Sequence, residues 1–255
     1  MDNNVKHFVV MAIGQNHEEL MKEYSKGKET EPYVKYRYLD AEKYLKKAKE
    51  VIERLIEKHS EVMTTDINRA LKTKLEMLKG LTPFEYYRIL TEGLYYDTDG
   101  NAISTENPDG KFDKCTIGGM FSNPLILLDK SEVASARKGD IDWSELHLKN
   151  IESYERVWEL AMTDTEPVDD NEKKIKEEVS HMTNYYSRFK TKEIYAKYST
   201  AFWTFAIVDE NGWRDMDTEL NGDSEEWVNT FYEKYIVPMS DDTLITIYEC
   251  VLQED

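Results

Sequence analysis

Two adjacent glycines lie at the centre of the least generic stretch of this chain, residues 111–121. Gly118 and Gly119 stand between apolar residues after a long run of turn residues, and glycine pairs permit backbone conformations and close approaches that side chains forbid. The pair lacks the lysine and hydroxyl residue of a P-loop and the third glycine of a dinucleotide turn. The pattern predicts a constrained backbone. One hypothesis is that a small nucleotide-like ligand binds near Lys111, Asp113 and the two glycines.

A second compact motif, Gly-Asp-Ile-Asp-Trp, contains Asp140, Asp142 and Trp143. A carboxylate can act as a general acid or base when a neighbouring group shifts its pKa. Asp113 paired with Asp140 or Asp142 is therefore the acid–base pair to test if the protein is an enzyme. The competing interpretation of Asp142 is a helix N-cap, since Glu145 stands three residues after it where a helical pattern begins.

The sequence gives little support to metal or cofactor chemistry. Cys115 and Cys250 are the only cysteines, too few and too far apart for a disulfide framework or a zinc site built on cysteine pairs. The five histidines show no paired spacing. A calcium loop starting at Asp97 would need glycine where Ala102 stands and a carboxylate where Pro108 stands, so a hairpin turn explains this segment better. We predict no metal and no cofactor.

The chain carries 33 basic and 51 acidic side chains, a net charge of −18. Such a charge repels phosphate backbones and anionic lipid, so we expect no direct binding of nucleic acid or membrane. Two interpretations stay open: a solubilising surface, or an acidic surface that occupies a basic groove built for DNA or RNA. The apolar run at residues 8–13 is too short for a secretory core or a membrane span, and we expect a cytoplasmic protein.

Hydrophobic patterning predicts an α+β fold. Apolar or β-branched stretches at about 7–14, 114–128, 202–216 and 243–252 predict one small, mainly antiparallel sheet. Helical spacing over about 40–92 and 142–198 predicts helices that elaborate the sheet within a single domain, residues 1–255. Matching strand and helix pieces at both ends of the chain suggest a split βαβ arrangement resembling the ferredoxin-like motif.

Three helical segments have specific signals. Thr82 and Glu85 form a capping-box pattern around Pro83, which predicts a helix start. Helical spacing continues over residues 142–161, which predicts one helix there. A long helix is expected over about 171–195, and its aromatic stripe is interpreted as core or partner contact rather than a stacking platform for bases.

The chain also contains a series of short motifs, which are Asp97-Thr98-Asp99-Gly100-Asn101, Asn107-Pro108, Lys111-Phe112-Asp113, Ile117-Gly118-Gly119-Met120-Phe121, Gly139-Asp140-Ile141-Asp142-Trp143 and Asp241-Asp242-Thr243-Leu244. With these motifs it resembles, over most of its length, an uncharacterised protein family met in bacteriophages and bacterial genomes. That family carries Ile-Gly-Gly-Arg-Trp at the glycine pair, so Met120 replaces an arginine that would place a cation there. The resemblance implies a phage or mobile-element setting and brings no established activity.

These patterns lead us to expect a non-enzymatic accessory protein that inhibits a host defence component by binding it. The partner would be a host protein, either a nucleic-acid-binding defence protein whose basic site the acidic surface covers, or one with a protein interface to occupy. The alternatives are capture of a nucleotide-like ligand at the glycine pair and an enzyme with a carboxylate-based site. The candidate binding residues are Lys111, Asp113, Gly118, Gly119, Asp140, Asp142 and Trp143.

Overall fold

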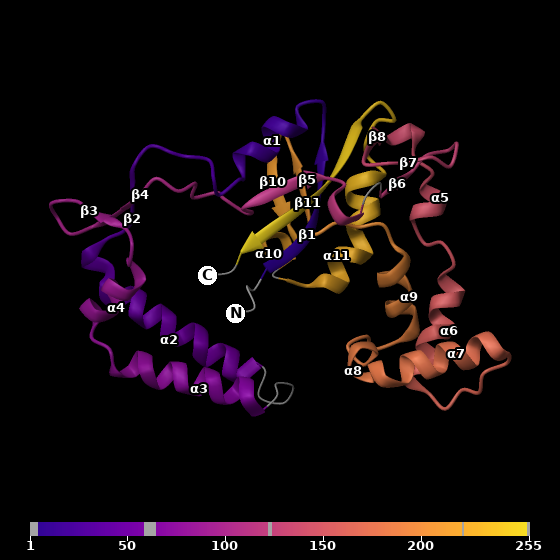
Figure 1. Cartoon of the computed structure of the whole chain (residues 1–255), viewed down its shortest axis with the longest axis horizontal. Helices are drawn as coiled ribbons and strands as arrows, with labels where there is room; N and C mark the ends of the chain where they lie inside the picture. Colours follow the sequence, from indigo (N-terminus) through magenta and orange to yellow (C-terminus); the bar gives the residue numbers. More distant parts are fainter. Residues whose placement is uncertain (1–4, 59–64, 122–123, 221, 254–255) are drawn as a thin grey trace. The chain divides into compact units, whose positions relative to one another are not determined.

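The computed structural model describes residues 5–58, 65–121, 124–220 and 222–253 (Figure 1). Contacts divide the chain into two compact units, a larger one formed by residues 1–28 and 108–255 and a smaller one formed by residues 29–107. The smaller unit buries apolar side chains of its own. The single domain over residues 1–255 stays a prediction. None of the described helices combines the length and apolar composition needed to cross a membrane.

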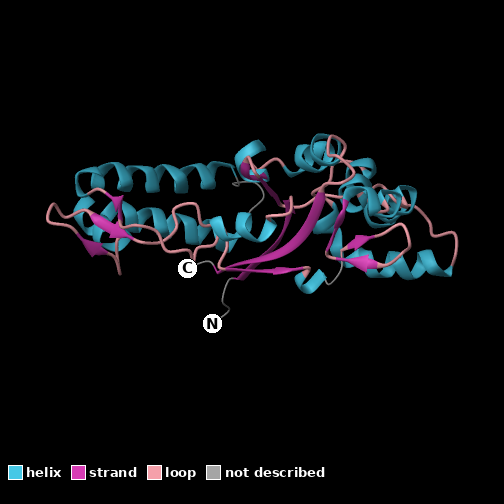
Figure 2. Ribbon diagram, turned by 90° about the horizontal axis from the view of Figure 1, so that it is seen from above, coloured by secondary structure: helices cyan, strands magenta, loops and turns pink. Residues whose placement is uncertain are grey.

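A six-stranded sheet forms the centre of the larger unit. Its strand order is β10, β9, β1, β11, β5, and β8 also pairs with β11. The strands are β1 (Val5–Ile13), β5 (Lys114–Ile117), β8 (Ser135–Arg137), β9 (Ala206–Asp209), β10 (Gly212–Asp215) and β11 (Leu244–Gln253). Each of the four predicted strand regions contributes to the sheet, which Figure 2 shows as a twisted layer of magenta strands.

The pairing of β1 with β11 joins segments that are far apart in the chain. The two strands are antiparallel from the pair Val5–Gln253 to the pair Ile13–Ile245. Because β5 is also antiparallel to β11, β11 lies between the parallel strands β1 and β5, as in a split βαβ unit. The sheet departs from the ferredoxin-like pattern at β9, which is parallel to β1. The predicted α+β class with small, mainly antiparallel sheets is confirmed.

Alternating side chains of β1 build a core on each face of the sheet. Val10 lies in the cluster that contains Met21 of α1 (His17–Glu23). Met11 lies in the opposite cluster, with Trp227 of α11 (Ser224–Phe231). The sheet is therefore covered on both faces, and α11 is fixed to it by its apolar side.

The helix predicted over residues 142–161 is two helices, α5 (Trp143–Leu146) and α6 (Ile151–Met162). Between them, Leu148 and Asn150 have φ angles of 59° and 60°, in the left-handed region, which interrupts a right-handed helix. The prediction of one continuous helix is wrong because the spacing of apolar residues continues across this break.

The long helix predicted over about 171–195 is also interrupted, giving α7 (Asp170–Val179), α8 (Thr183–Tyr186) and α9 (Lys192–Thr200). Thr191 starts the last of these, since its hydroxyl accepts a hydrogen bond from the Ile194 N–H. Tyr186 and Tyr195 nevertheless pack in one buried cluster with α6. The interpretation of the aromatic stripe as core is confirmed, whereas its continuity in one helix is wrong.

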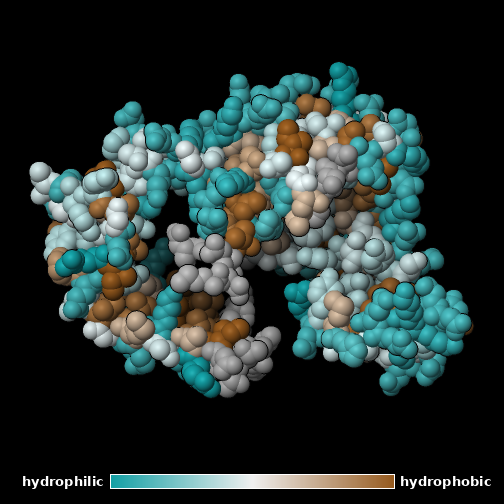
Figure 3. Space-filling view, viewed as in Figure 1, coloured by the Kyte–Doolittle hydropathy of each residue, from teal (hydrophilic) through white to brown (hydrophobic). Residues whose placement is uncertain are grey.

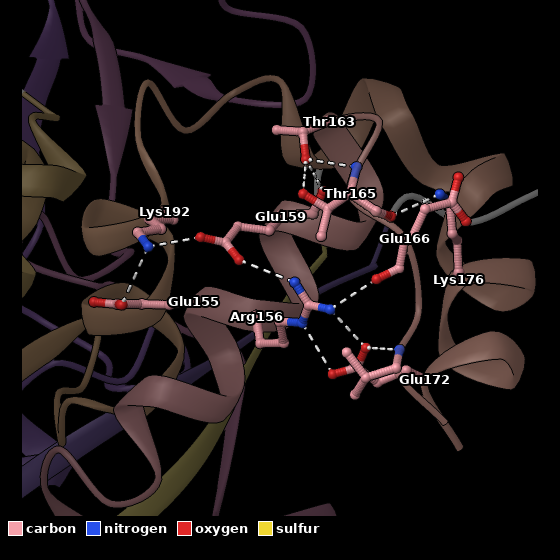
Figure 4. Close-up of polar contacts among 10 residues, drawn as sticks. Glu155, Arg156, Glu159, Thr163, Thr165, Glu166, Glu172, Lys176 and Lys192 are labelled. Carbon is pink, nitrogen blue, oxygen red and sulfur yellow. Dashed lines mark hydrogen bonds and ion pairs between the residues drawn. The ribbon is translucent and has the colours of Figure 1, made fainter. Parts of the chain in front are cut away.

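A polar network ties the acidic loop at residues 163–169 to the helices around it (Figure 4). Arg156 of α6 binds the Glu172 carboxylate through two hydrogen bonds, of 2.9 Å from Nε and 2.7 Å from a terminal nitrogen. The same guanidinium donates to the Glu166 carbonyl at 3.0 Å. Lys192 of α9 donates to Glu159 of α6 at 2.6 Å. Paired, planar contacts of this kind fix both distance and orientation.

This network predicts a specific loss of stability in acid. Arg156 holds the pKa of Glu172 at about 2, below its ordinary value of 4.5. Because the pKa is lower in the folded state, the stabilisation is fully present above about pH 4.5 and disappears as the pH falls through about 2. Thermal melts of Glu172→Gln should therefore show a lower Tm than wild type at pH 7 and a smaller further loss between pH 4.5 and 2.

The control for this experiment is Glu177→Gln, on the exposed side of the same helix. Its melts should follow the wild type at each pH. A Glu172→Gln protein with the same acid sensitivity as wild type would contradict the role given to this ion pair.

The smaller unit packs α2 (Ala41–Lys58), α3 (Thr65–Gly80) and α4 (Pro83–Leu90) beside a sheet of order β2 (Tyr33–Tyr36), β4 (Ala102–Ser104), β3 (Tyr95–Tyr96). The predicted capping box is confirmed, since Thr82 and Glu85 each accept a hydrogen bond from the backbone N–H of the other. The predicted hairpin turn is confirmed as well, with the Asp97 carboxylate accepting from the N–H groups of Asp99 and Asn101.

Candidate functional site

A buried carboxylate lies on the central strand β11 of the larger unit. Glu249 is 8% exposed and accepts hydrogen bonds from the Met120 N–H at 2.6 Å and from His7 Nδ1 at 2.7 Å. The Met120 N–H, followed by His7, holds the pKa of Glu249 below its usual range. The carboxylate is thus ionised at neutral pH. Because an ionised carboxylate can only accept hydrogen bonds, His7 must carry a proton on Nδ1 to bond to it.

The glycine pair forms the wall of this carboxylate site. Gly118 and Gly119 have φ angles of 70° and 55°, so the predicted constraint on the backbone is present. A Cβ atom on Gly119 would lie 2.0 Å from Glu249 Oε2. The glycines therefore let the chain approach Glu249 and turn the Met120 N–H toward it. A phosphate at this position would meet a negative charge and find that N–H already bonded.

Lys111 and Asp113 lie at the other end of β5 and close the edge of the sheet. The Asp113 carboxylate accepts a hydrogen bond from the Gln253 N–H at 2.7 Å, and the Asp113 N–H donates to the Val251 carbonyl. The Lys111 N–H donates to the Tyr24 carbonyl at 2.7 Å. The two Asp113 contacts extend the pairing of β5 and β11, and the Lys111 contact ties the start of this segment to the end of α1, so both roles are structural.

Asp142 and Trp143 form a separate group near the ribbon β6 (Leu125–Ile126) and β7 (Glu132–Val133). The Asp142 carboxylate accepts from Lys130 Nζ at 2.6 Å and from the Ser144 hydroxyl at 2.5 Å, and Lys130 is the main cause of its low pKa of about 2. Trp143 packs against Phe202. Asp142 occupies the N-cap position of α5. Its side chain binds Lys130, however, and accepts no capping hydrogen bond from the N–H groups of the helix.

The structure does not bring the predicted acid–base pair together. Asp113 is bonded to the last residues of β11, whereas the segment of Asp140 is bonded to residues just before β11, where the Gly139 N–H donates to the Asp241 carbonyl. A ten-residue strand is roughly 30 Å long. A low pKa such as that of Asp142 also keeps a carboxylate ionised, so it cannot supply a proton near neutral pH.

The pair His7–Glu249 was not among the predicted site residues. Its sequence signal is one glutamate inside an otherwise apolar and β-branched strand, with a histidine in the strand that pairs with it. A carboxylate that orients Nδ1 of an imidazole leaves Nε2 available for proton transfer, and the His7 side chain is 46% exposed. Within the described residues, no cluster of three or more His, Cys, Asp or Glu side chains could hold a metal ion.

The acidic charge is concentrated in one unit. Residues 29–107 contain 15 acidic and 13 basic side chains, whereas the larger unit contains 36 acidic and 20 basic ones. Part of this excess covers α10 (Met216–Leu220), α11 with its N-cap, and the π-helical turn η5 (Tyr232–Ile236) that follows α11. The exposed acidic residues there are Asp217, Glu219, Asp223, Glu225, Glu226 and Glu233. We call these six residues the acidic surface. Lys234, which binds Glu219 at 2.9 Å, is a cation beside them.

No family model matches the chain, and searches of curated proteins and of solved structures find no match either. The fold and sites described above define an α+β protein with a charged larger unit, and the resemblance to a phage and bacterial family stays a prediction.

Proposed function

We propose that the protein is a non-enzymatic binding protein that presents the acidic surface of its larger unit to a basic site on a host protein. The setting is a phage or mobile element, the compartment is the cytoplasm of the bacterial host, and the effect is inhibition of a defence component. The observation that carries this proposal is the segregation of charge, with a net charge of −16 in the larger unit and −2 in the smaller one.

The acidic surface has a rigid support. The opposite side of α11 is buried through Trp227, Val228 and Phe231, all at most 2% exposed, and Trp227 and Phe231 belong to the core on one face of the sheet. The helix backbone that carries Glu225 and Glu226 is therefore held in place, which favours recognition of a basic groove over simple solubility. A dense negative patch of this kind also speeds association with a positively charged partner.

The glycine pair offers weaker support for the nucleotide-like ligand, because Glu249 occupies the position that a phosphate would need. The enzyme alternative gains one specific observation, the oriented His7–Glu249 pair. Among the described residues, the hydrogen-bond partner of the His7 ring is Glu249. This carboxylate can orient the imidazole, but a covalent mechanism would also need a nucleophile beside it. Binding through the acidic surface is thus the better-supported function.

Neutralising half of the acidic surface should strongly weaken binding. The test variant combines Asp217→Asn, Glu225→Gln and Glu226→Gln, which spares the helix cap Asp223 and the ion-paired Glu219. Immobilised wild-type protein should retain a basic, nucleic-acid-binding protein from a bacterial host lysate at about 50 mM NaCl and release it at about 300 mM. Retention by the triple variant should fall about tenfold or more.

The matched control removes the same amount of charge from the smaller unit, through Glu42→Gln, Glu53→Gln and Glu92→Gln, all at exposed positions. This control should retain the partner as the wild type does. Retention that survives neutralisation of the acidic surface, or that is lost equally in the control, would contradict the proposal. A DNA duplex added to the lysate should compete for the captured protein.

A further inference from the structure

The smaller unit contains a pocket of about 520 Å³ between α4, the hairpin of β3 and β4, and the short 3₁₀ turn that precedes α2. Its size is within the range of sites for small organic molecules. The lining residues that matter here are Tyr38, Phe84, Tyr87, Arg88, Tyr96 and Asp99. All of them belong to residues 29–107, so the pocket is complete within this unit.

Aromatic rings form the walls of the pocket and are held in place. Tyr38 stands nearly perpendicular to Phe84 and to Tyr87, at interplanar angles of 82° and 81° and centroid distances of 6.1 and 5.5 Å. The buried Tyr87 is fixed by its hydroxyl, which donates to the Gly100 carbonyl and accepts from the Ala102 N–H, both at 2.9 Å. The hydroxyl of Tyr96 is 2.7 Å from that of Thr91.

Three of the large aromatic rings that line the pocket are exposed. Tyr38, Phe84 and Tyr96 are 40%, 52% and 51% exposed. Figure 3 also shows brown patches of hydrophobic side chains on the surface of the smaller unit, at the left of the view. Rings that are fixed in position but not covered can stack on a planar ligand with little loss of conformational entropy.

Two charged side chains at the pocket indicate which planar ligand would fit. Arg88 is exposed and forms no ion pair or hydrogen bond with the described residues, so its guanidinium is available for an anion. Asp99 lines the same pocket and is not paired with Arg88. The neighbouring Asp97 is engaged by the turn, where Asn101 supplies hydrogen bonds from both its backbone and its side chain.

We propose that this pocket binds a nucleoside monophosphate, with the base stacked on the face of an exposed ring, the phosphate on Arg88 and a ribose or base donor on Asp99. A cationic ligand would suit the perpendicular rings alone, but the unpaired guanidinium would repel it. The site is in the unit that carries almost no net charge, so the phosphate meets little general repulsion there. This goes beyond the acidic surface, which is in the other unit.

The experiment is calorimetric titration of the full-length protein with adenosine 5′-monophosphate. Wild type should bind at one saturable site. Arg88→Gln and Phe84→Ala should each weaken binding about tenfold or more, through loss of the phosphate contact and of one stacking ring. Both residues are exposed, so neither change should unfold the unit. Adenosine and inorganic phosphate should each bind far more weakly than the nucleotide.

Arg54→Gln, at an exposed arginine of α2 outside the pocket, is the matched control and should bind as wild type. The proposal is overturned if no saturable binding occurs up to about 5 mM nucleotide, a range that includes weak ligands of this size. It is also overturned if Arg88→Gln or Phe84→Ala binds as tightly as wild type, or if Arg54→Gln weakens binding as much as they do.

Discussion

Replacing Gly119 with alanine should destabilise the larger unit by about 3 kcal/mol or more. The new Cβ would lie 2.0 Å from Glu249 Oε2 and 2.3 Å from Glu249 Cβ, which is much closer than any van der Waals contact. The φ angle of +55° adds strain for a residue with a side chain. β11 cannot move away without breaking its pairing with β1, so relief of the clash requires the backbone at Gly119 to shift away from Glu249.

Urea denaturation followed by tryptophan fluorescence measures this effect, because all five tryptophans are in the larger unit. The control is Gly222→Ala in the same unit, where φ is +80° and the nearest atom to the new Cβ is 3.5 Å away. It should cost only the strain, about 1 kcal/mol. If Gly119→Ala and Gly222→Ala lose the same unfolding free energy, close packing against Glu249 is not the reason that glycine is required at position 119.

Replacing Trp227 with alanine should cost about 3–5 kcal/mol. The side chain is 1% exposed and packs between Phe231 and Tyr235, at centroid distances of 5.6 and 5.5 Å. Its indole N–H donates to the Thr204 carbonyl at 2.8 Å in a buried position. Truncation would leave a large cavity under α11 and an unsatisfied carbonyl at the end of the helix–sheet interface.

Trp227→Phe separates these two contributions. It keeps most of the apolar volume but removes the donor to Thr204, so its cost should be intermediate between wild type and Trp227→Ala. Circular dichroism during urea denaturation gives the order of stability for all three proteins. If Trp227→Ala unfolds at the same urea concentration as wild type, Trp227 does not fix α11 to the sheet. The acidic surface would then lack the rigid support on which the proposed function depends.

The sequence predicts a constrained backbone at the glycine pair. It could not predict that Glu249 packs against this backbone, and the structure explains why. Glu249 is 130 residues away, and a contact of that sequence separation is set by the pairing of β5 with β11 rather than by any local pattern. The candidate site residues lie close together in the sequence, between positions 111 and 143. The sheet separates them, because β5 places Asp113 at one end of its pairing with β11 and Gly119 at the other.

Short sequence motifs with a defined hydrogen-bond geometry predict the local structure most accurately. The capping box at Thr82 and the turn at Asp97 depend on hydrogen bonds within a few residues, so the sequence determines them directly. Helix lengths were less accurate, since apolar spacing identifies a buried stripe and not the continuity of the backbone that carries it. The left-handed residue Asn150 and the cap Thr191 interrupt helices whose apolar stripes continue beyond the break.

The pairing of β1 with β11 also sets an order of events during synthesis. β1 is synthesised long before its longest partner, residues 244–253, so the central sheet cannot form until the intervening chain and β11 have left the ribosome. The smaller unit is one continuous segment, residues 29–107, and can assemble while the rest is still being translated. The unpaired β1 is meanwhile an exposed apolar strand that a ribosome-bound chaperone would need to shield.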